Sequence, residues 1–306
     1  MQEFELIRRF FRRGIADTSV VCGPGDDAAV LSPEPGRELV MTTDTQVEGR
    51  HFPEDLPVAD IGWRSLAVNL SDLAAMGADP RWCMLTLSLP VGDEAWLATF
   101  CEGFFELAGI AGITLVGGDM VRGPLAITVQ AVGDVPTGSA LFRDGARPGD
   151  RLCISGVPGE SAAGLAQWQA GVRQGELVAR FARPRAELEL GCTLRGRASA
   201  CIDVSDGLLA DLRHMLEASG CGAELDAAAL PVSAALRAWR DPDHVLRTQL
   251  AGGDDYLLLF ALPAGQPLPG DCHVIGSFEQ EPGLRVRGLD GQRMSGLPDG
   301  FDHFSG

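Results

Sequence analysis

Residues 69–78 read Asn-Leu-Ser-Asp-Leu-Ala-Ala-Met-Gly-Ala and close a long apolar segment. This segment predicts a helix over residues 59–76 that ends at Gly77, because glycine readily adopts the left-handed conformation that terminates helices. Residues three or four positions apart are neighbours on a helix, so Asp72 shares its face with three side chains. These are Ser65, Asn69 and Met76. The helix therefore presents a carboxylate with polar companions on an otherwise apolar surface.

Strand-like and helix-like stretches alternate on both sides of this helix. A second helix is predicted over 94–108, with Asp93 as its N-cap and an aromatic stripe that we interpret as core packing. The predicted strands of the first half are 38–43, 83–89 and 125–132. The second half has predicted strands at 151–154, 200–204, 223–225 and 256–261, and predicted helices that include 208–218 and 233–239. This mixture favours an α+β protein, or α/β protein, of two lobes.

A stretch rich in glycine and proline, residues 133–149, is typical of a junction between domains. The length of 306 residues also suits two domains of about 150 residues each. We therefore expect an N-terminal domain over 1–137 and a C-terminal domain over 138–306.

Composition excludes several classes of phosphate chemistry. All 25 basic residues are arginine, and 42 acidic residues give a net charge of −17. Without lysine there is no Walker-type phosphate loop, no protein-kinase strand lysine and no Schiff base. The acidic balance disfavours nucleic acid as a partner. No apolar run approaches 18 residues and the amino terminus lacks a signal-peptide pattern, so we expect a cytoplasmic protein that binds no membrane.

The eight cysteines form no CxxC pair, which favours reduced and mostly buried thiols over a zinc site or a disulfide scaffold.

Many carboxylates stand beside glycines at the ends of apolar strands, where side chains gather around a cleft. The motifs are Gly25-Asp26-Asp27, Thr42-Thr43-Asp44, Gly117-Gly118-Asp119, Asp203-Val204-Ser205-Asp206-Gly207 and Gly252-Gly253-Asp254-Asp255-Tyr256. Two unpaired anions about 4 Å apart repel by about 4 kcal/mol at an effective dielectric of 20, so converging carboxylates need cations among them. Oxygen ligands without histidine or cysteine select Mg²⁺, and six carboxylates imply several ions and a polyphosphate ligand.

These motifs, in this order, resemble the thiamine-monophosphate kinase family of the PurM-like, aminoimidazole-ribonucleotide-synthetase superfamily. Two further runs carry the resemblance most specifically, Asn69–Ala78 and Thr42–Phe52. The resemblance implies a PurM-like N-terminal domain whose mixed sheet pairs across a homodimer, and a C-terminal α/β domain of mixed sheet flanked by helices. It implies that the N-terminal domain binds metal and ATP, and that the active site lies between the lobes.

The implied reaction is the ATP- and Mg²⁺-dependent phosphorylation of thiamine monophosphate to thiamine diphosphate by direct in-line transfer, the final step of thiamine diphosphate biosynthesis. The implied metal ligands are Asp27, Thr42, Thr43, Asp44, Asp72, Asp119, Asp203 and Asp206. The implied ATP contacts are Gly118, Asp119, Arg143 and Ser205. The implied substrate residues are His51, Asp254 and Phe301. We expect Asp44, Asp72 and Arg143 to carry catalysis.

The chain departs from the family pattern at three places. Asp254 stands where the family usually has glutamate, and Met120 replaces the usual threonine. The aromatic residue often found near the adenine is absent from 109–112. We interpret the single tyrosine, Tyr256, as a packing residue on the strand 256–261.

Other readings of the motifs stay open. A different member of the superfamily is the nearest, although selenophosphate synthetases use a lysine and the hydrogenase-maturation relatives end in a reactive cysteine. A ligase-type purine enzyme shares the fold. A non-catalytic acidic metal-binding protein belongs to another class and would show broken ligand positions, whereas a haloacid-type phosphatase would need a lysine.

Overall fold

The computed structural model describes residues 3–11 and 17–297, and the chain forms two compact units. The first unit comprises Met1–Leu73 and Ala78–Gly138, and the second comprises Ala74–Gly77 and Ser139–Gly306.

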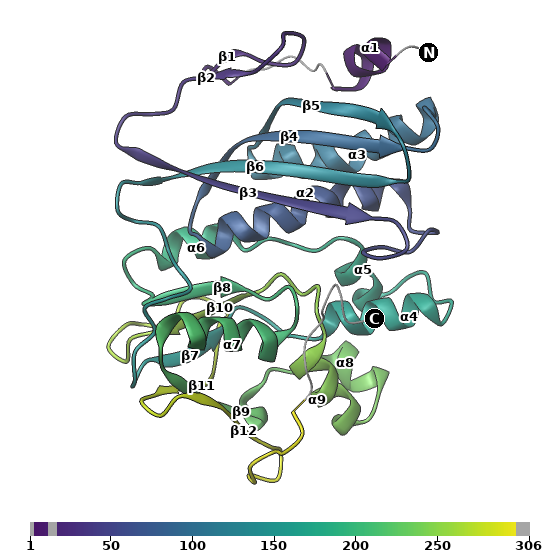
Figure 1. The fold of residues 1–306 in the computed structure, drawn as a ribbon. Coiled ribbons are helices and arrows are strands. Elements are labelled where there is room, and N and C mark those ends of the chain that lie inside the picture. Colours follow the sequence, from purple (N-terminus) through teal and green to yellow (C-terminus); the bar gives the residue numbers. More distant parts are fainter. Residues whose placement is uncertain (1–2, 12–16, 298–306) are drawn as a thin grey trace. The chain divides into compact units, whose positions relative to one another are not determined.

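The first unit is built on a four-stranded mixed sheet (Figure 1). Its order is β3-β6-β4-β5, so β3 and β5 form its two edges. The strands are β3 (Arg37–Val47), β4 (Asp79–Leu89), β5 (Thr114–Arg122) and β6 (Ala126–Pro136). β6 pairs antiparallel with β3 and β4, whereas β4 and β5 are parallel.

Two helices, α2 (Val58–Ala75) and α3 (Glu94–Ala111), cover one face of this sheet (Figure 1). They approach so closely that a Cβ atom added at Gly103 would lie 1.7 Å from the carbonyl oxygen of Ala59. The predicted N-cap of α3 is confirmed, because Asp93 accepts the backbone N–H groups of the next turn. The predicted end of α2 is also confirmed, with Gly77 at a φ of 67°.

The aromatic stripe of α3 packs in the core as predicted. Trp96 and Phe100 are stacked with ring centroids 5.2 Å apart, and Phe100 and Phe104 are stacked at 6.0 Å.

The opposite face of the sheet is more open. Strand side chains alternate between faces, and four large apolar side chains are exposed on its strands. These are Leu39, Met41, Met84 and Val121.

A short amino-terminal region precedes the sheet. It contains α1 (Glu3–Leu6), the π-helix η1 (Ile7–Phe11) and an antiparallel pair, β1 (Val20–Cys22) and β2 (Val30–Leu31). The glycine-rich loop 23–29 connects β1 to β2.

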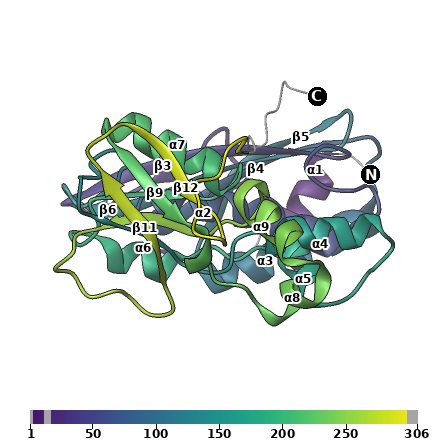
Figure 2. The same ribbon diagram turned by 90° about the horizontal axis from the view of Figure 1, so that it is seen from below.

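The second unit contains a six-stranded mixed sheet of order β12-β9-β11-β7-β10-β8. Its strands are β7 (Arg151–Ile154), β8 (Ala200–Asp203), β9 (Gly222–Asp226), β10 (Leu258–Leu262), β11 (His273–Glu279) and β12 (Gly283–Arg287). β9 and β12 are parallel, the other neighbours are antiparallel, and β12, β9 and β11 lie side by side in Figure 2.

Helices flank this second sheet, and separate buried clusters line its two faces. The helices are α4 (Glu160–Gln169), α5 (Glu176–Ala182), α6 (Leu188–Leu194), α7 (Leu208–Ser219), the 3₁₀ turn η2 (Ala227–Ala229), α8 (Ala234–Trp239) and α9 (Pro242–Ala251).

Most predicted elements are present, with shifted ends. Six elements were not predicted from the sequence pattern: β1, β2, β5, β11, β12 and α9. The placement of Tyr256 on a strand is wrong, because β10 begins at Leu258 and Tyr256 has a φ of 53°.

The prediction of free thiols is confirmed, since all eight cysteines are free and six are buried. Burial raises the pKa of the Cys83 thiol to about 12, which makes it unreactive. In the part of the chain that the structure describes, no helix is both long and apolar enough to cross a bilayer.

Candidate active site

Thr42 and Asp72 join the edge strand β3 to helix α2. The Thr42 hydroxyl donates a hydrogen bond to Asp72 Oδ2 at a distance of 2.5 Å. Asp44 lies on the same face of β3 as Thr42, about 7 Å further along, because side chains alternate. Gln46 follows on that face and accepts a hydrogen bond from buried Arg64 of α2 at 3.2 Å. Three predicted ligands, Thr42, Asp44 and Asp72, therefore share the side of β3 that faces α2.

Thr43 occupies the opposite face of the same strand. Its hydroxyl donates to the carbonyl oxygen of Val129 on β6 at 3.2 Å. The two threonine hydroxyls of the motif therefore point to different sides of the sheet.

His51 follows β3 in a tight turn. The backbone N–H of Val47 donates to His51 Nδ1 at 3.0 Å, and the carbonyl oxygen of Val47 accepts from the His51 backbone at 2.9 Å. Because Nδ1 acts as an acceptor, the ring carries its proton on Nε2. His51 is thus held as a donor through Nε2.

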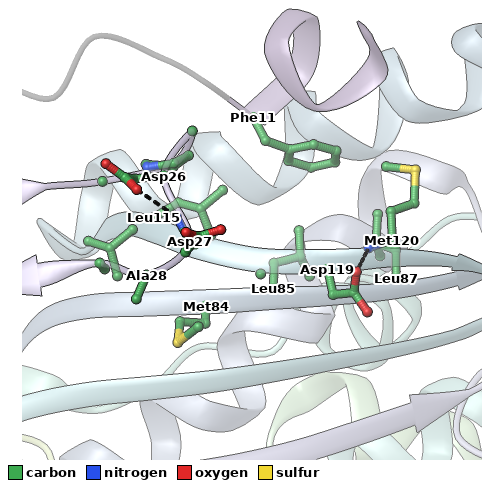
Figure 3. Close-up of a pocket in the computed structure, with 17 residues that line it drawn as sticks. Phe11, Asp26, Asp27, Ala28, Met84, Leu85, Leu87, Leu115, Asp119 and Met120 are labelled. Atoms are coloured by element: carbon green, nitrogen blue, oxygen red, sulfur yellow. Dashed lines mark hydrogen bonds between the residues drawn. The ribbon is translucent and has the colours of Figure 1, made fainter. Parts of the chain in front are cut away.

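A cavity of about 510 Å³ lies beside β5 in the first unit. Its lining combines carboxylates, Asp26, Asp27 and Asp119, with apolar side chains that include Phe11, Leu115 and Met120. Figure 3 shows the Phe11 ring extending from η1 toward the strands, with the carboxylates of the loop 23–29 on one side and Asp119 on the other. Phe11 was not among the predicted site residues, because nothing in its local sequence pattern distinguishes it from a core residue.

Only glycine fits the backbone conformation and the close contact at position 118. Its φ is 146°, and an added Cβ would lie 1.8 Å from the carbonyl oxygen of Leu85 on β4. The glycine therefore lets β5 approach β4 closely at this point. The next residue, Asp119, is exposed, and its Oδ1 accepts from the Met120 backbone at 2.9 Å.

Asp44 and Asp119 lie at opposite edges of the sheet. Asp44 pairs with Val129, which pairs with Leu85, which pairs with Gly118. Three strand spacings separate β3 from β5, so the backbones at these two positions lie about 14 Å apart. An ion bound by oxygen at about 2.1 Å cannot be reached by both within one chain. Over residues 3–11 and 17–297, no three acidic, histidine or cysteine side chains are grouped closely enough to hold a metal.

In the second unit, the loop after β8 is organised by one buried carboxylate. Asp211, in the first turn of α7, is 3% exposed. Its Oδ2 accepts the consecutive backbone N–H groups of Ser205, Asp206 and Gly207 at 3.0, 3.1 and 3.2 Å. Burial raises the pKa of the Asp211 carboxyl to about 7, and the charge of Asp206 adds to the rise. Asp211 was not among the predicted site residues, because its only local signal in the sequence is its position four residues after Gly207.

The loop 252–256 lies directly against this first loop. Asp254 N–H donates to the Ser205 carbonyl and Tyr256 N–H to the Val204 carbonyl, both at 2.8 Å. A Cβ at Gly253 would lie 2.5 Å from the Ser205 carbonyl oxygen. Predicted residues Asp203, Ser205, Asp206 and Asp254 are therefore brought together in the second unit.

Asp255 anchors the other side of this loop. Its carboxylate accepts the backbone N–H groups of Gly159 at 2.5 Å and Ser161 at 3.1 Å, at the start of α4. Burial raises the pKa of the Asp255 carboxyl to about 7.

Arg143 is exposed on the segment that precedes β7. The N–H of Cys201 donates to the carbonyl oxygen of neighbouring Phe142 at 2.8 Å. Arg143 therefore lies beside the start of β8. Asp203 is two residues beyond Cys201 on that strand, about 7 Å along it. Phe301, the remaining predicted substrate residue, lies outside the described residues.

Two domain families match nearly the whole chain. The N-terminal domain of AIR synthase related proteins matches residues 25–135, and the C-terminal domain of the same proteins matches residues 147–287. Fold and site thus define a two-domain AIR synthase related protein, and the predicted PurM-like fold is confirmed.

Individual relatives show which family of AIR synthase related proteins the chain belongs to. A thiamine-monophosphate kinase of Salmonella typhimurium is 43% identical over 99% of this chain and 98% of its own length. The crystal structure of the thiamine-monophosphate kinase from Stenotrophomonas maltophilia matches with a TM-score of 0.87 and 43% identity, over 96% of this chain and 98% of the other. The AaThiL complex with AMPPCP and TMP matches with a TM-score of 0.81 and 32% identity, over 92% and 91%. The chain belongs to the thiamine-monophosphate kinase family.

Proposed function

We propose that this protein transfers the γ-phosphoryl group of ATP to thiamine monophosphate and forms thiamine diphosphate and ADP, the final step of thiamine diphosphate biosynthesis. The observation that carries the proposal is the similarity to the AaThiL complex with AMPPCP and TMP, over 92% of this chain. The 43% identity to the Salmonella typhimurium enzyme supports it over the full length.

The cavity beside β5 suits the nucleotide. Gly118 and Asp119 line it, and its apolar wall includes Phe11, Leu115 and Met120. A purine base is flat and stacks well on an aromatic ring. Phe11 thus supplies an aromatic group in place of the one absent from 109–112. In the proposal, Arg143 and Ser205 of the C-terminal domain, 138–306, contact the same nucleotide.

The donor set fits Mg²⁺, since it consists of carboxylate and hydroxyl oxygens, the ligands that this hard ion prefers. The proposed ligands are Asp27, Thr42, Thr43, Asp44, Asp72, Asp119, Asp203 and Asp206. When bound, Mg²⁺ offsets the charge of the β- and γ-phosphate oxygens. Removal of divalent ions with EDTA is therefore expected to stop turnover.

The acceptor needs no strong base. A phosphate monoester has a second pKa of about 6, so its attacking oxygen is already deprotonated at pH 7. The remaining task is to align two anions for in-line transfer, which is achieved by positioning and charge neutralisation. Asp44 and Asp72 serve this task through the ions they hold, and Arg143 binds phosphate oxygens in its planar fork. His51 donates through Nε2 to the substrate, while Asp254 and Phe301 line the thiamine side.

A homodimer is part of the proposal. The N-terminal domain, 1–137, exposes four large apolar side chains on one sheet face, and such a surface favours association. The separation of Asp44 from Asp119 within one chain adds a second argument. If both serve the same nucleotide and ions, one comes from each copy. The proposal also includes a cytoplasmic location and no nucleic acid or membrane partner, in keeping with the net charge of −17.

To test the proposal, the protein is incubated with Mg-ATP and thiamine monophosphate, and thiamine diphosphate and ADP are quantified by chromatography. We expect equal amounts of the two products. Thiamine without its phosphate serves as the matched acceptor control, and ATP alone measures background hydrolysis. Absence of thiamine diphosphate above the ATP-only background rules the proposal out.

A further inference from the structure

The segment 252–256 has an unusual backbone. Within the described residues, Asp254 and Tyr256 are the two non-glycine residues at positive φ, with values of 69° and 53°. Aspartate enters this left-handed region at modest cost, but a bulky residue such as tyrosine rarely does. Strained positions of this kind persist where the surrounding structure holds them, and they are frequent at functional sites.

The surrounding structure holds this segment from two sides. Its backbone is bonded to Val204 and Ser205 on one side, both at 2.8 Å. On the other side, Asp255 is bonded to the start of α4. The strained conformation is therefore imposed by neighbours of the segment and does not depend on the tyrosine ring alone.

The result of this conformation is a contact between two side chains. The Tyr256 hydroxyl donates to Asp254 Oδ1 at 2.9 Å. The tyrosine is 6% exposed, so its ring is fixed by packing and its hydroxyl is a rigid donor. A hydrogen bond from a rigid donor restricts the aspartate to one orientation, and bonds to charged acceptors are the stronger kind.

We propose that Tyr256 is a positioning residue that aims the Asp254 carboxylate at the thiamine moiety of the substrate. The inference rests on the proposed function, in which Asp254 lines the thiamine side. A carboxylate repels the phosphate end of the substrate but attracts the positively charged thiazolium end. Aspartate has one rotatable bond fewer than the glutamate that is usual in the family. A single hydrogen bond, from the hydroxyl two residues away, is therefore enough to hold the carboxylate in one orientation. The tyrosine thereby contributes to recognition of the acceptor.

The first test is Tyr256→Phe, which removes the hydroxyl and keeps the ring. We expect the KM for thiamine monophosphate to rise about 10-fold, as for the loss of one hydrogen bond to a charged group. The KM for ATP and the kcat should each change less than about 2-fold, because they depend on residues other than Tyr256 and Asp254. Ser233→Ala is the matched control, because it also removes one hydroxyl group in a hydrogen bond: the Ser233 oxygen accepts from the backbone N–H of Leu236 at the start of α8. It should leave both KM values unchanged.

A double-mutant cycle separates positioning from general stability. In the Asp254→Asn background, Tyr256→Phe should raise the KM for thiamine monophosphate much less than it does in the wild-type chain. A merely structural tyrosine would lower the melting temperature and leave the KM for thiamine monophosphate unaltered, and that result overturns the inference.

A spectroscopic measurement does not depend on the Phe variant folding. Tyr256 is the only tyrosine in the chain, so global incorporation of 3-fluorotyrosine labels this position alone. We expect its single ¹⁹F resonance to shift on saturation with thiamine monophosphate and to stay in place with ATP alone. An unmoved resonance in an enzyme that phosphorylates thiamine monophosphate contradicts the inference. A wild-type protein without that activity instead contradicts the proposed function.

Discussion

The carboxylates of the two units are positioned in different ways. In the first unit, Asp27, Asp44 and Asp119 are exposed on a loop and on edge strands. In the second unit, Asp206 and Asp254 belong to loops held by the carboxylates of Asp211 and Asp255. The loops of the second set are thus held by hydrogen bonds within the protein, whereas in the proposed function the carboxylates of the first set are held by the ions that they bind. Changes in the first unit should therefore affect chemistry, and changes in the second should also affect stability.

The largest effect is expected for Asp44→Asn or Asp72→Asn. In the proposed function each removes a negative charge that holds cations near the transferred group, and we expect turnover to fall about 1000-fold. The melting temperature should stay close to that of the wild type. Glu102→Gln on α3 is the control, because it neutralises an exposed carboxylate on the same unit. Near-normal turnover in Asp72→Asn would show that the first unit is not the chemical centre.

Mixing two inactive variants tests whether Asp44 of one subunit and Asp119 of another form one active site. If Asp44 and Asp119 act across a dimer, Asp44→Asn and Asp119→Asn subunits form hybrids with one intact site. Co-refolding them in equal amounts should restore about a quarter of the wild-type activity, since half of the dimers are hybrids with one of two sites intact. No recovery in demonstrably mixed dimers would place both carboxylates in one chain's site.

Asp211→Ala should be the most destabilising change in the second unit. It leaves the N–H groups of residues 205–207 without their acceptor, at a cost of about 3 kcal/mol in the free energy of unfolding. Urea denaturation measures this loss. Asp241→Ala is the comparison, because Asp241 accepts one N–H group at the start of α9, and its loss should cost about 1 kcal/mol. Equal effects of the two variants would show that Asp211 has no special role.

The Asp255 carboxyl predicts a pH dependence of stability. Its pKa of about 7 in the folded state lies above its ordinary value of 3.8, so the folded chain binds the extra proton between these limits. Its contribution to stability is complete below pH 3.8 and is lost as the pH rises toward 7. The free energy of unfolding of the wild type, minus that of Asp255→Asn, should therefore fall by about 3 kcal/mol between pH 5 and pH 8. A difference that grows with pH contradicts this.

Phe11→Ala should have the smallest of these effects. In the proposed function the Phe11 ring lies beside the adenine, so its loss should raise the KM for ATP about 10-fold. The KM for thiamine monophosphate should not change, because the ring lines the cavity that we propose for the nucleotide. Phe11→Leu, which keeps apolar bulk without a stacking face, should be intermediate. An unaltered KM for ATP in both variants would remove Phe11 from the site.

Local rules predicted the features that depend on neighbours in the sequence. The helix carrying Asp72, its end at Gly77 and the Asp93 cap of α3 all follow from residues within a few positions. The motifs also indicated which carboxylates to consider. Local rules failed at Tyr256, where an apolar run indicated a strand but contacts with Val204 and Ser205 impose a left-handed turn.

Other features could not be predicted because they depend on distant contacts. The need for glycine at position 118 comes from the close approach of Leu85 on another strand, and Phe11 reaches the cavity only through the placement of η1. The opposite-edge positions of Asp44 and Asp119 required the strand order, which the local pattern does not contain.

The most direct test of the proposed activity follows the phosphoryl group itself. The protein is incubated with [γ-³²P]ATP, Mg²⁺ and thiamine monophosphate, with Asp72→Asn as the blank, and the products are separated. The account predicts label in thiamine diphosphate in equal amount to the ADP formed, and none with the blank. Label released only as inorganic phosphate would contradict the account, because it would show hydrolysis of ATP without transfer to the acceptor.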